Sequence, residues 1–145
     1  MNKDEILEII EYQFGKEVRK ELEGLNFEIK KFKSRKIDIL INNFAILHLN
    51  PKFFLFTIDK QFSKILRKCK KFYIKIDGRF LEDIKKTKNI IKQNIIDYSK
   101  DFRANDDIII LDENENLIGI AKAKLNSYEI SNATYGIVAK VKKFI

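Results

Sequence analysis

The stretch KNIIKQNIIDYSKDFRANDDIIILDENENLIGIAKAKL, from Lys88 to Leu125, contains three short apolar segments separated by polar turns. The segments are residues 90–96, 108–111 and 117–123, and they are rich in β-branched isoleucine. Short apolar runs bounded by Asp, Asn and Gly are typical of strands in a small β fold. With the flanking apolar runs at residues 72–76 and 136–144, the stretch predicts a small barrel or sandwich at the C-terminal end of the chain.

The N-terminal half has helical periodicity instead. Between Asp4 and Leu22 the apolar residues recur mostly at three- and four-residue intervals, which predicts one helical face, and Gly15 is expected to break this helix in two. A second, basic amphipathic helix is expected after Thr57, which we assign as its cap, and it ends near Cys69. The apolar positions of this second helix are Phe62, Ile65 and Leu66, and its basic face comprises Lys60, Lys64, Arg67 and Lys68.

Between the two helical segments the alternation indicates strands. They are expected at residues 27–32, 37–41, 44–49 and 53–56, and Asn42 and Asn43 are suited to a tight hairpin turn. The composition changes near Lys70. We therefore predict an α+β fold with an α/β domain at residues 1–70 and a small β-barrel domain at residues 71–145, packed rigidly together because no flexible linker separates them.

The charge distribution favours a polyanionic partner. The chain carries a net charge of +8 with a pI near 9.4, and residues 30–100 hold 19 basic and 6 acidic side chains, a net +13. Such segregation favours RNA or an anionic membrane surface. The sequence lacks a basic helix with a bulky exposed apolar face, and no window approaches a membrane span, so RNA is the stronger prediction. A lone Cys69 fits a reducing cytoplasm.

Few residues are suited to catalysis or to metal binding. One histidine, His48, and one cysteine are too few for a zinc site, and the five dispersed glycines form no phosphate-binding loop. We expect His48 to be a half-buried strand residue, and the acidic pairs Glu82–Asp83 and Asp112–Glu113 to lie in solvated turns. The prediction is a non-catalytic binding protein with no catalytic residues, metal or cofactor.

Several of these residues form a family pattern in the C-terminal half. FRANDD at residues 102–107 is followed by an apolar strand, by Gly119 and Ala121, by Glu129–Ile130 and by YGIVAKV at residues 135–141. This arrangement resembles the PUA domain, the compact RNA-binding barrel of pseudouridine synthases and archaeosine transglycosylases. Two family glycines differ here: Asn105 can adopt a positive φ, but β-branched Thr87 resists it, so we expect the loop at Thr87 to differ.

The N-terminal half extends the resemblance. YQFG at residues 12–15, SRK at residues 34–36 and the hairpin that follows are similar to the pre-PUA region of archaeal tRNA-guanine transglycosylases. The resemblance implies a pre-PUA and PUA pair without the catalytic barrel of those enzymes. Within YQFG we expect Tyr12 and Phe14 in the core and Gly15 at a helix cap.

The resemblance also implies where RNA binds. In PUA domains that resemble this one, the loop at the position of Thr87 and the last strand face the acceptor stem and 3′ end of tRNA. The corresponding candidate RNA-binding residues here are Lys85, Lys86, Lys88, Asn89, Lys92, Lys140, Lys142 and Lys143. A second basic patch comprises Lys30, Lys31, Lys33, Arg35 and Lys36. Lysine ammonium groups neutralise phosphates, whereas Asn can hydrogen-bond an unpaired base.

The functional prediction is recognition of structured tRNA in tRNA modification. One alternative is a ribosome-assembly factor that binds rRNA. Another is an accessory subunit that delivers tRNA to a separate modifying enzyme, with Phe53, Phe54 and Phe56 as a candidate apolar patch for that protein partner.

Overall fold

The computed structural model describes residues 1–50, 52, 55–134 and 136–145. The chain forms two compact units, Met1–Ile65 and Leu66–Ile145. Helix α3 (Lys60–Cys69) runs across the boundary between them. The division that we predicted after residue 70 lies at the C-terminal end of this helix and remains a prediction.

Two helices form the start of the first unit. Helix α1 (Lys3–Phe14) begins with a capping box, in which the Asn2 side chain accepts from the backbone of Glu5 and the Glu5 carboxylate accepts from the backbone of Asn2. Helix α2 (Lys16–Glu23) follows after Gly15, whose φ of 100° allows the chain to turn sharply between the helices. The predicted break at Gly15 is confirmed.

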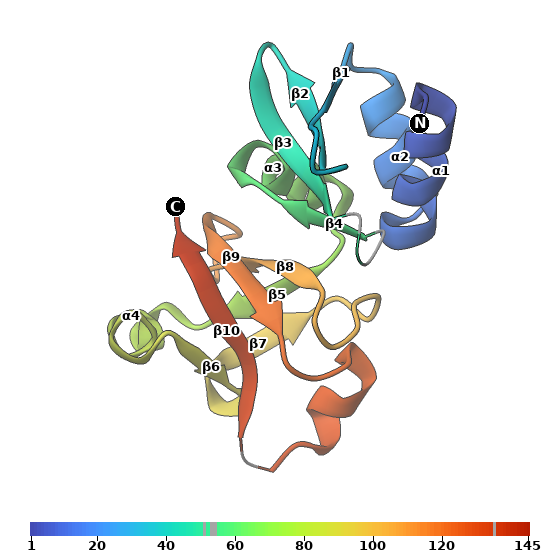
Figure 1. The fold of residues 1–145 in the computed structure, drawn as a ribbon. Coiled ribbons are helices and arrows are strands. Elements are labelled where there is room, and N and C mark those ends of the chain that lie inside the picture. The colour runs from blue at the N-terminus through green and yellow to red at the C-terminus, as the bar shows by residue number, and fades with distance from the viewer. Residues whose placement is uncertain (51, 53–54, 135) are drawn as a thin grey trace. The chain divides into compact units, whose positions relative to one another are not determined.

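A four-stranded antiparallel sheet completes this unit (Figure 1). Its strands follow chain order: β1 (Glu28–Lys31), β2 (Ile37–Ile41), β3 (Phe44–Asn50) and β4 (Leu55–Ile58). Asn42 and Asn43 both have positive φ, at 52° and 68°, which is the geometry of a two-residue hairpin turn. The hairpin predicted around these two residues is therefore confirmed.

Three expectations for this unit need correction. Thr57 lies within β4 and does not cap α3; the strand continues to Ile58, and the Asp59 carboxylate accepts from the backbone N–H of Lys60 instead. Tyr12 is 80% exposed and lies outside the core. Phe56 is buried and so cannot belong to an exposed apolar patch, while Phe53 and Phe54 lie outside the described residues.

The second unit is built on a six-stranded sheet with the order β6-β10-β9-β8-β5-β7 (Figure 1). Its strands are β5 (Tyr73–Ile76), β6 (Asn89–Ile91), β7 (Ile95–Tyr98), β8 (Asp107–Leu111), β9 (Leu117–Ala123) and β10 (Ile137–Phe144). All neighbours are antiparallel except β5 and β8. Every residue of β8 is buried, which places this strand at the centre of the core.

The sheet is curled, and one short segment shows why. We predicted a single strand at residues 90–96, but the structure divides it into β6, a 3₁₀ turn η2 (Lys92–Asn94) and β7. Strands β6 and β7 lie at opposite ends of the sheet order, although three residues separate them in sequence. With three residues between them, the end of β6 and the start of β7 are at most about 14 Å apart, so the two edges must approach each other. This confirms the predicted fold class of an α/β unit followed by a small β-barrel.

Sequence periodicity did not predict helix α4 (Leu81–Thr87), which follows the 3₁₀ turn η1 (Gly78–Phe80). Glu82 and Asp83 lie in its first turn, where carboxylates stabilise the positive end of the helix dipole, and not in a solvated loop. The other acidic pair does lie in a turn. Asp112 accepts from the backbone of Asn114 and Asn116, and Glu113 accepts from the backbone of Gly78.

Candidate nucleic-acid interface

The end of helix α4 positions the first group of predicted RNA-binding residues. Lys85 and Lys86 lie in its last turn, and Lys88 caps it in the left-handed conformation at φ 58° and ψ 20°. The backbone N–H of Lys88 donates to the carbonyl of Ile84 at 2.7 Å. All three lysines are exposed.

Thr87, which we expected to resist a positive φ, remains in helix α4. The positive φ occurs one residue later, at Lys88. The Thr87 hydroxyl lies 3.1 Å from the carbonyl oxygen of Asp83, to which it donates, and 3.1 Å from the backbone N–H of Asn89, from which it accepts. A β-branched residue is thus accommodated by moving the turn one residue along the chain.

The last strand of the chain contacts this turn directly. The backbone N–H of Val141 in β10 donates to the carbonyl of Lys88 at 2.8 Å, and Lys140 pairs with Asn89 across the two strands. Two segments about fifty residues apart in sequence therefore form one surface. The structure therefore brings Lys88 and Asn89 of the predicted loop next to Lys140 of the predicted strand.

The strand register extends this surface by one residue that sequence reasoning missed. Lys140 pairs with Lys122 in β9, and Lys122 pairs with Asp107 in β8. Residues directly opposite each other on neighbouring strands project from the same face of a sheet. The alternation of Lys122 with buried Ala121 and Ala123 marked it as outward-facing, but only the register shows that it neighbours Lys140.

Lys142 and Lys92 each make a contact that holds the ammonium group against the protein. The Lys142 ammonium contacts both carboxylate oxygens of Asp107 at 3.0 Å, and the Asp107 side chain is 4% exposed. The Lys92 ammonium donates to the carbonyl oxygen of Ser131 at 2.7 Å. Lys143 is exposed and follows a register shift in β10. We define the basic strip as the exposed residues Lys85, Lys86, Lys88, Lys122 and Lys140, together with Asn89 between them.

The FRANDD segment forms the turn before β8. Asn105 has φ 76°, as its place in the family pattern required, and the Asp106 carboxylate accepts from the backbone N–H of Arg103 at 2.8 Å. Burial raises the pKa of Asp106 above its ordinary value, although the backbone of Arg103 partly offsets this effect. Its carboxylate thus stabilises the turn.

The second basic patch lies on β1 and the turn after it. The backbone of Phe32 donates to the carbonyl of Lys36 at 2.9 Å, which closes the turn, and Arg35 has φ 69°. The ammonium groups of Lys30 and Lys36 lie 5.0 and 6.0 Å from the centroid of the Phe32 ring, within cation–π range. All five basic residues of this patch are exposed.

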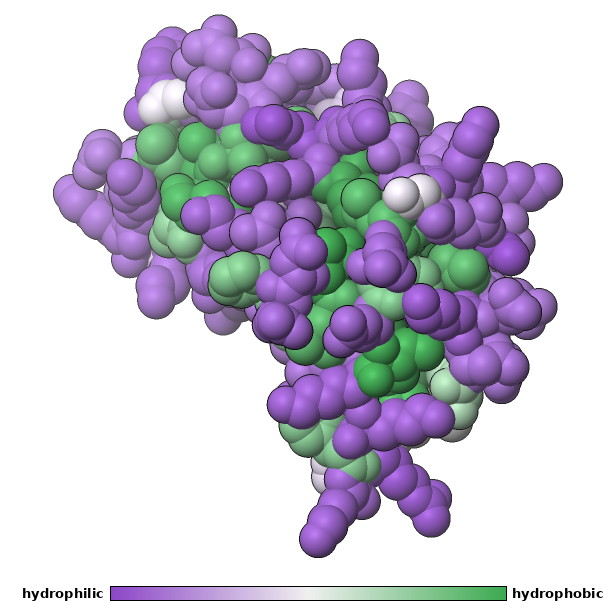
Figure 2. Space-filling model, turned by 90° about the horizontal axis from the view of Figure 1, so that it is seen from above, coloured by the Kyte–Doolittle hydropathy of each residue, from purple (hydrophilic) through white to green (hydrophobic). Residues whose placement is uncertain are grey.

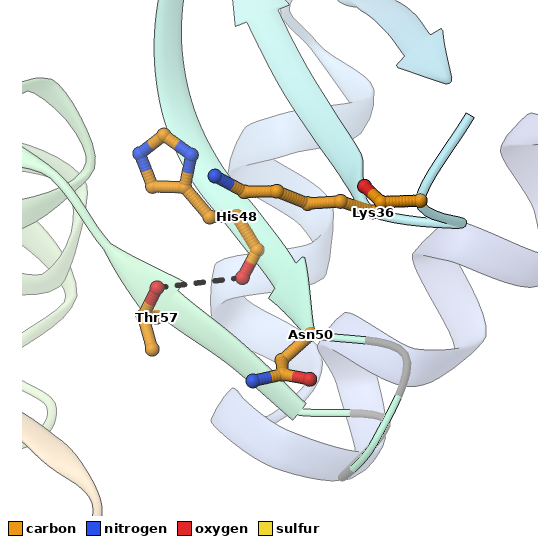
Figure 3. Close-up of a pocket in the computed structure, with 5 residues that line it drawn as sticks. Lys36, His48, Asn50 and Thr57 are labelled. Carbon is orange, nitrogen blue, oxygen red and sulfur yellow. Dashed lines mark hydrogen bonds between the residues drawn. The ribbon is translucent and has the colours of Figure 1, made fainter. Parts of the chain in front are cut away.

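A shallow pocket of about 470 Å³ adjoins this patch (Figure 3). It is lined by Ser34, Lys36, His48, Asn50 and Thr57, and the Lys36 side chain extends toward the His48 ring. The His48 Nδ1 and Nε2 atoms lie 2.9 Å from Asp38 and 3.4 Å from Asp59, respectively. His48 is partly buried, as expected, and its ring is held by these carboxylates. The described residues contain no group of three or more His, Cys, Asp or Glu suited to a metal ion.

Hydrophilic side chains dominate the face of the molecule seen in Figure 2, and apolar side chains form smaller groups between them. Within the described part of the chain, no helix is both long enough and apolar enough to cross a membrane.

Comparison with known proteins identifies the second unit. The sequence profile of the PUA domain family matches residues 72–145, about half of the chain. The chain belongs to the PUA domain family. The PUA prediction made from FRANDD and the residues around it is therefore confirmed.

Two curated relatives match over different extents. The chain is 26% identical over 135 residues to the archaeosine synthase subunit alpha of Thermoplasma acidophilum, an alignment that covers 92% of this chain and 24% of that protein. It is 36% identical over 73 residues to an uncharacterised protein of Methanocaldococcus jannaschii, which covers 50% of this chain and 15% of that protein. The chain thus spans a quarter or less of the length of these relatives.

Two solved structures share the fold over nearly the whole length of this PUA protein. A hypothetical protein of Pyrococcus horikoshii superposes with a TM-score of 0.70 at 16% identity, covering 97% of this chain and 88% of that one. A conserved PUA domain protein of Thermoplasma acidophilum gives a TM-score of 0.61 at 14% identity, covering 99% and 91% of the two chains. The architecture of an α/β unit followed by a PUA unit therefore recurs in these proteins.

Proposed function

We propose that this PUA protein binds structured RNA through the basic strip and catalyses no reaction itself. The observation that supports the proposal is the paired row of Asn89, Lys140 and Lys122 beside Lys88, whose carbonyl accepts from the backbone N–H of Val141. Lysine ammonium groups neutralise phosphates and release counterions. The Asn89 amide adds a hydrogen-bonding group that is suited to a ribose hydroxyl or a base edge.

We propose that the RNA ligand is tRNA and that the protein binds its acceptor end. The relative of known name that aligns over most of the chain is an archaeosine synthase subunit, and this similarity supports a role in tRNA modification. Most of the basic strip lies on a turn and on strands, so we propose that recognition depends on A-form shape and an unpaired 3′ end. The second basic patch offers further cationic groups for RNA phosphates, and a tRNA-modifying enzyme would be the protein partner.

Fluorescence anisotropy tests this function with a full-length tRNA transcript, the same transcript without its 3′ CCA, an rRNA helix and duplex DNA, each at several salt concentrations. We expect the intact tRNA to bind most tightly, with a salt slope that corresponds to several phosphate contacts. Equal, steeply salt-dependent binding to all four would overturn the tRNA proposal. Preference for the rRNA helix would favour the ribosome-assembly alternative.

Charge-reversal variants locate the interface. Lys86→Glu and Lys140→Glu should each weaken tRNA binding about tenfold and reduce the salt slope by about 1. Lys60→Glu and Lys64→Glu change the same charge on the exposed face of α3 and serve as matched controls. Equal losses for both pairs would indicate that the net charge alone determines binding.

A further inference from the structure

Tyr128 is an exposed aromatic side chain in the PUA unit that the basic strip does not include. It lies in the 3₁₀ helix η3 (Ser127–Asn132) and is 72% exposed. It borders a shallow depression of about 570 Å³. The other lining residues are Leu125, Glu129, Asn132, Ala133 and Thr134. The Tyr128 ring therefore offers a flat apolar face, with a polar hydroxyl at its end, beside this depression.

Hydrogen bonds hold Tyr128 in place. The Asn126 side-chain amide donates to the Tyr128 hydroxyl oxygen at 3.0 Å, and the Asn126 carbonyl oxygen accepts from the backbone N–H of Ala104 at 2.9 Å. The backbone of Ser127 also donates to Phe102 at 3.0 Å. The ring is thus anchored to the FRANDD turn, and a ligand that stacks on it loses little side-chain entropy.

The residues around the ring indicate the chemistry of the ligand. Leu125 and Ala133 add apolar surface, whereas Glu129 places a carboxylate at the rim. One oxygen of Glu129 accepts from the backbone N–H of Asn126 at 3.0 Å, which leaves its other oxygen as an acceptor. A carboxylate repels phosphate and accepts from an amino group, so the ligand is a planar ring that carries a hydrogen-bond donor.

Helix η3 is also tied to the region of the basic strip. The Lys92 ammonium in η2, the turn that directly follows β6, donates to the carbonyl oxygen of Ser131 in η3 at 2.7 Å. Tyr128 and Ser131 are three residues apart, so they lie on the same edge of a 3₁₀ helix. The helix that carries Tyr128 is therefore tied to the turn that directly follows Asn89 and the rest of β6.

We propose that Tyr128 and Glu129 form a binding site for one unpaired nucleobase with an exocyclic amino group. The base stacks on the Tyr128 ring, and its amino group donates to Glu129. The base belongs to the RNA strand whose phosphates bind the basic strip, so this inference rests on the proposed function. A free nucleotide has the same chemistry, and the experiment separates the two sources.

The test uses the full chain and three hairpin RNAs: one blunt, one with a 3′ extension of four adenosines and one with a 3′ extension of four uridines. We expect the adenosine extension to tighten binding about tenfold over the blunt hairpin, because stacking of one base on an aromatic ring has this magnitude. Tyr128→Ala should remove this gain, and Tyr128→Phe should keep most of it. Tyr12→Ala, which removes an equally exposed tyrosine from α1, is the matched control and should change nothing.

Glu129→Gln tests the amino-group contact. Glutamine keeps an acceptor for the backbone of Asn126, so the fold of η3 should be retained, which thermal unfolding checks. The wild type should prefer the adenosine to the uridine extension several-fold, and Glu129→Gln should lose most of this preference, because its amide can also donate to a uracil carbonyl.

The outcomes separate this inference from the proposed function. If the wild type does not bind the blunt hairpin at all, the proposed function fails. If it binds the blunt and extended hairpins equally and Tyr128→Ala changes neither, the nucleobase site is wrong and RNA binding by the strip stands. If adenosine monophosphate saturates the Tyr128 site as tightly as the extended hairpin, and Lys86→Glu leaves the hairpin gain unchanged, the site takes free nucleotides and the assignment to the RNA strand is overturned.

Discussion

The backbone N–H of Val141 donates to the carbonyl oxygen of Lys88 at 2.8 Å, and Lys88 is held at φ 58°. The last strand thus fixes a left-handed residue at the end of α4. A side chain in this conformation costs about 1 to 2 kcal/mol, so the turn places the Lys88 ammonium at the expense of backbone strain.

Lys88→Gly distinguishes the effect of the Lys88 charge on RNA affinity from the effect of its backbone conformation on stability. Relief of the left-handed strain exceeds the entropic cost of glycine, roughly 0.5 to 1 kcal/mol, so the free energy of unfolding should rise by up to about 1 kcal/mol. RNA affinity should fall, because one phosphate contact is lost. Urea denaturation and anisotropy measure the two effects on the same protein. Lys88→Val, in contrast, should lose stability, and a Lys88→Gly variant that retains full RNA affinity would remove Lys88 from the interface.

Lys142 should stabilise the fold more than it binds RNA. Its ammonium faces the nearly buried carboxylate of Asp107, so Lys142→Met leaves that carboxylate without this partner and should cost about 1 to 3 kcal/mol of unfolding free energy. Lys140→Met, an exposed position on the same strand, should cost less than about 0.5 kcal/mol. Urea denaturation compares the two, and equal stabilities would contradict the assignment.

The side chain of Gln13 connects helix α1 to β4, the edge strand of the first sheet. Its side-chain amide donates to the carbonyl of Phe56 and accepts from the backbone N–H of Phe56, each at 2.8 Å. Gln13→Met leaves both backbone groups of β4 without this partner and should cost about 1 to 3 kcal/mol, measured by chemical denaturation. Tyr12→Ala, at the exposed neighbouring position, is the control. If Gln13→Met and Tyr12→Ala both have an equally small effect, water replaces Gln13 as the hydrogen-bonding partner of the Phe56 backbone.

The contrast between Tyr12 and Gln13 shows where sequence reasoning reached its limit. Helical periodicity correctly gave α1 and the apolar face with Phe14, but aromatic character misplaced Tyr12 in the core. The contact of Gln13 depends on β4, more than forty residues away, and no local pattern encodes that distance. Helix α4 was missed for a related reason, because Ile84 is its one buried residue in a polar segment.

The candidate interface was likewise predicted only in part from the sequence. The family pattern identified the α4 to β6 turn and the last strand, and the structure brings them together through Lys88 and Val141. Lys122 and the ion pair of Lys142 depend on the register of β8, β9 and β10, which the sequence does not specify. Tyr128 was passed over because a single tyrosine in a polar segment gives no periodic signal.

Gly119 allows β9 and β10 to approach closely. A Cβ at this position would lie 2.5 Å from the carbonyl oxygen of Lys143 and 3.3 Å from the Cα of Phe144, both backbone atoms that cannot move aside alone. Gly119→Ala should therefore cost about 1 to 3 kcal/mol of unfolding free energy. Gly24→Ala is the matched control, because no atom other than its own neighbours lies within 3.4 Å of that Cβ and its φ is negative. Thermal denaturation distinguishes them, and an unchanged midpoint for Gly119→Ala would refute the close approach.

Asp106 should make stability depend on pH. Burial raises its pKa above the ordinary value of 3.8, so the folded protein binds this proton more tightly than the unfolded chain does. Stability contributed by the protonated form is present below pH 3.8 and is lost as the pH rises through the folded-state pKa. Asp106→Asn keeps an acceptor for the backbone N–H of Arg103 and removes the charge of a partly buried carboxylate. The variant should therefore be more stable than the wild type at pH 7, with the difference shrinking toward pH 3.8, as followed by thermal unfolding across this range. A variant that is less stable at pH 7 would show that the ionised carboxylate holds the turn more strongly than its burial opposes it.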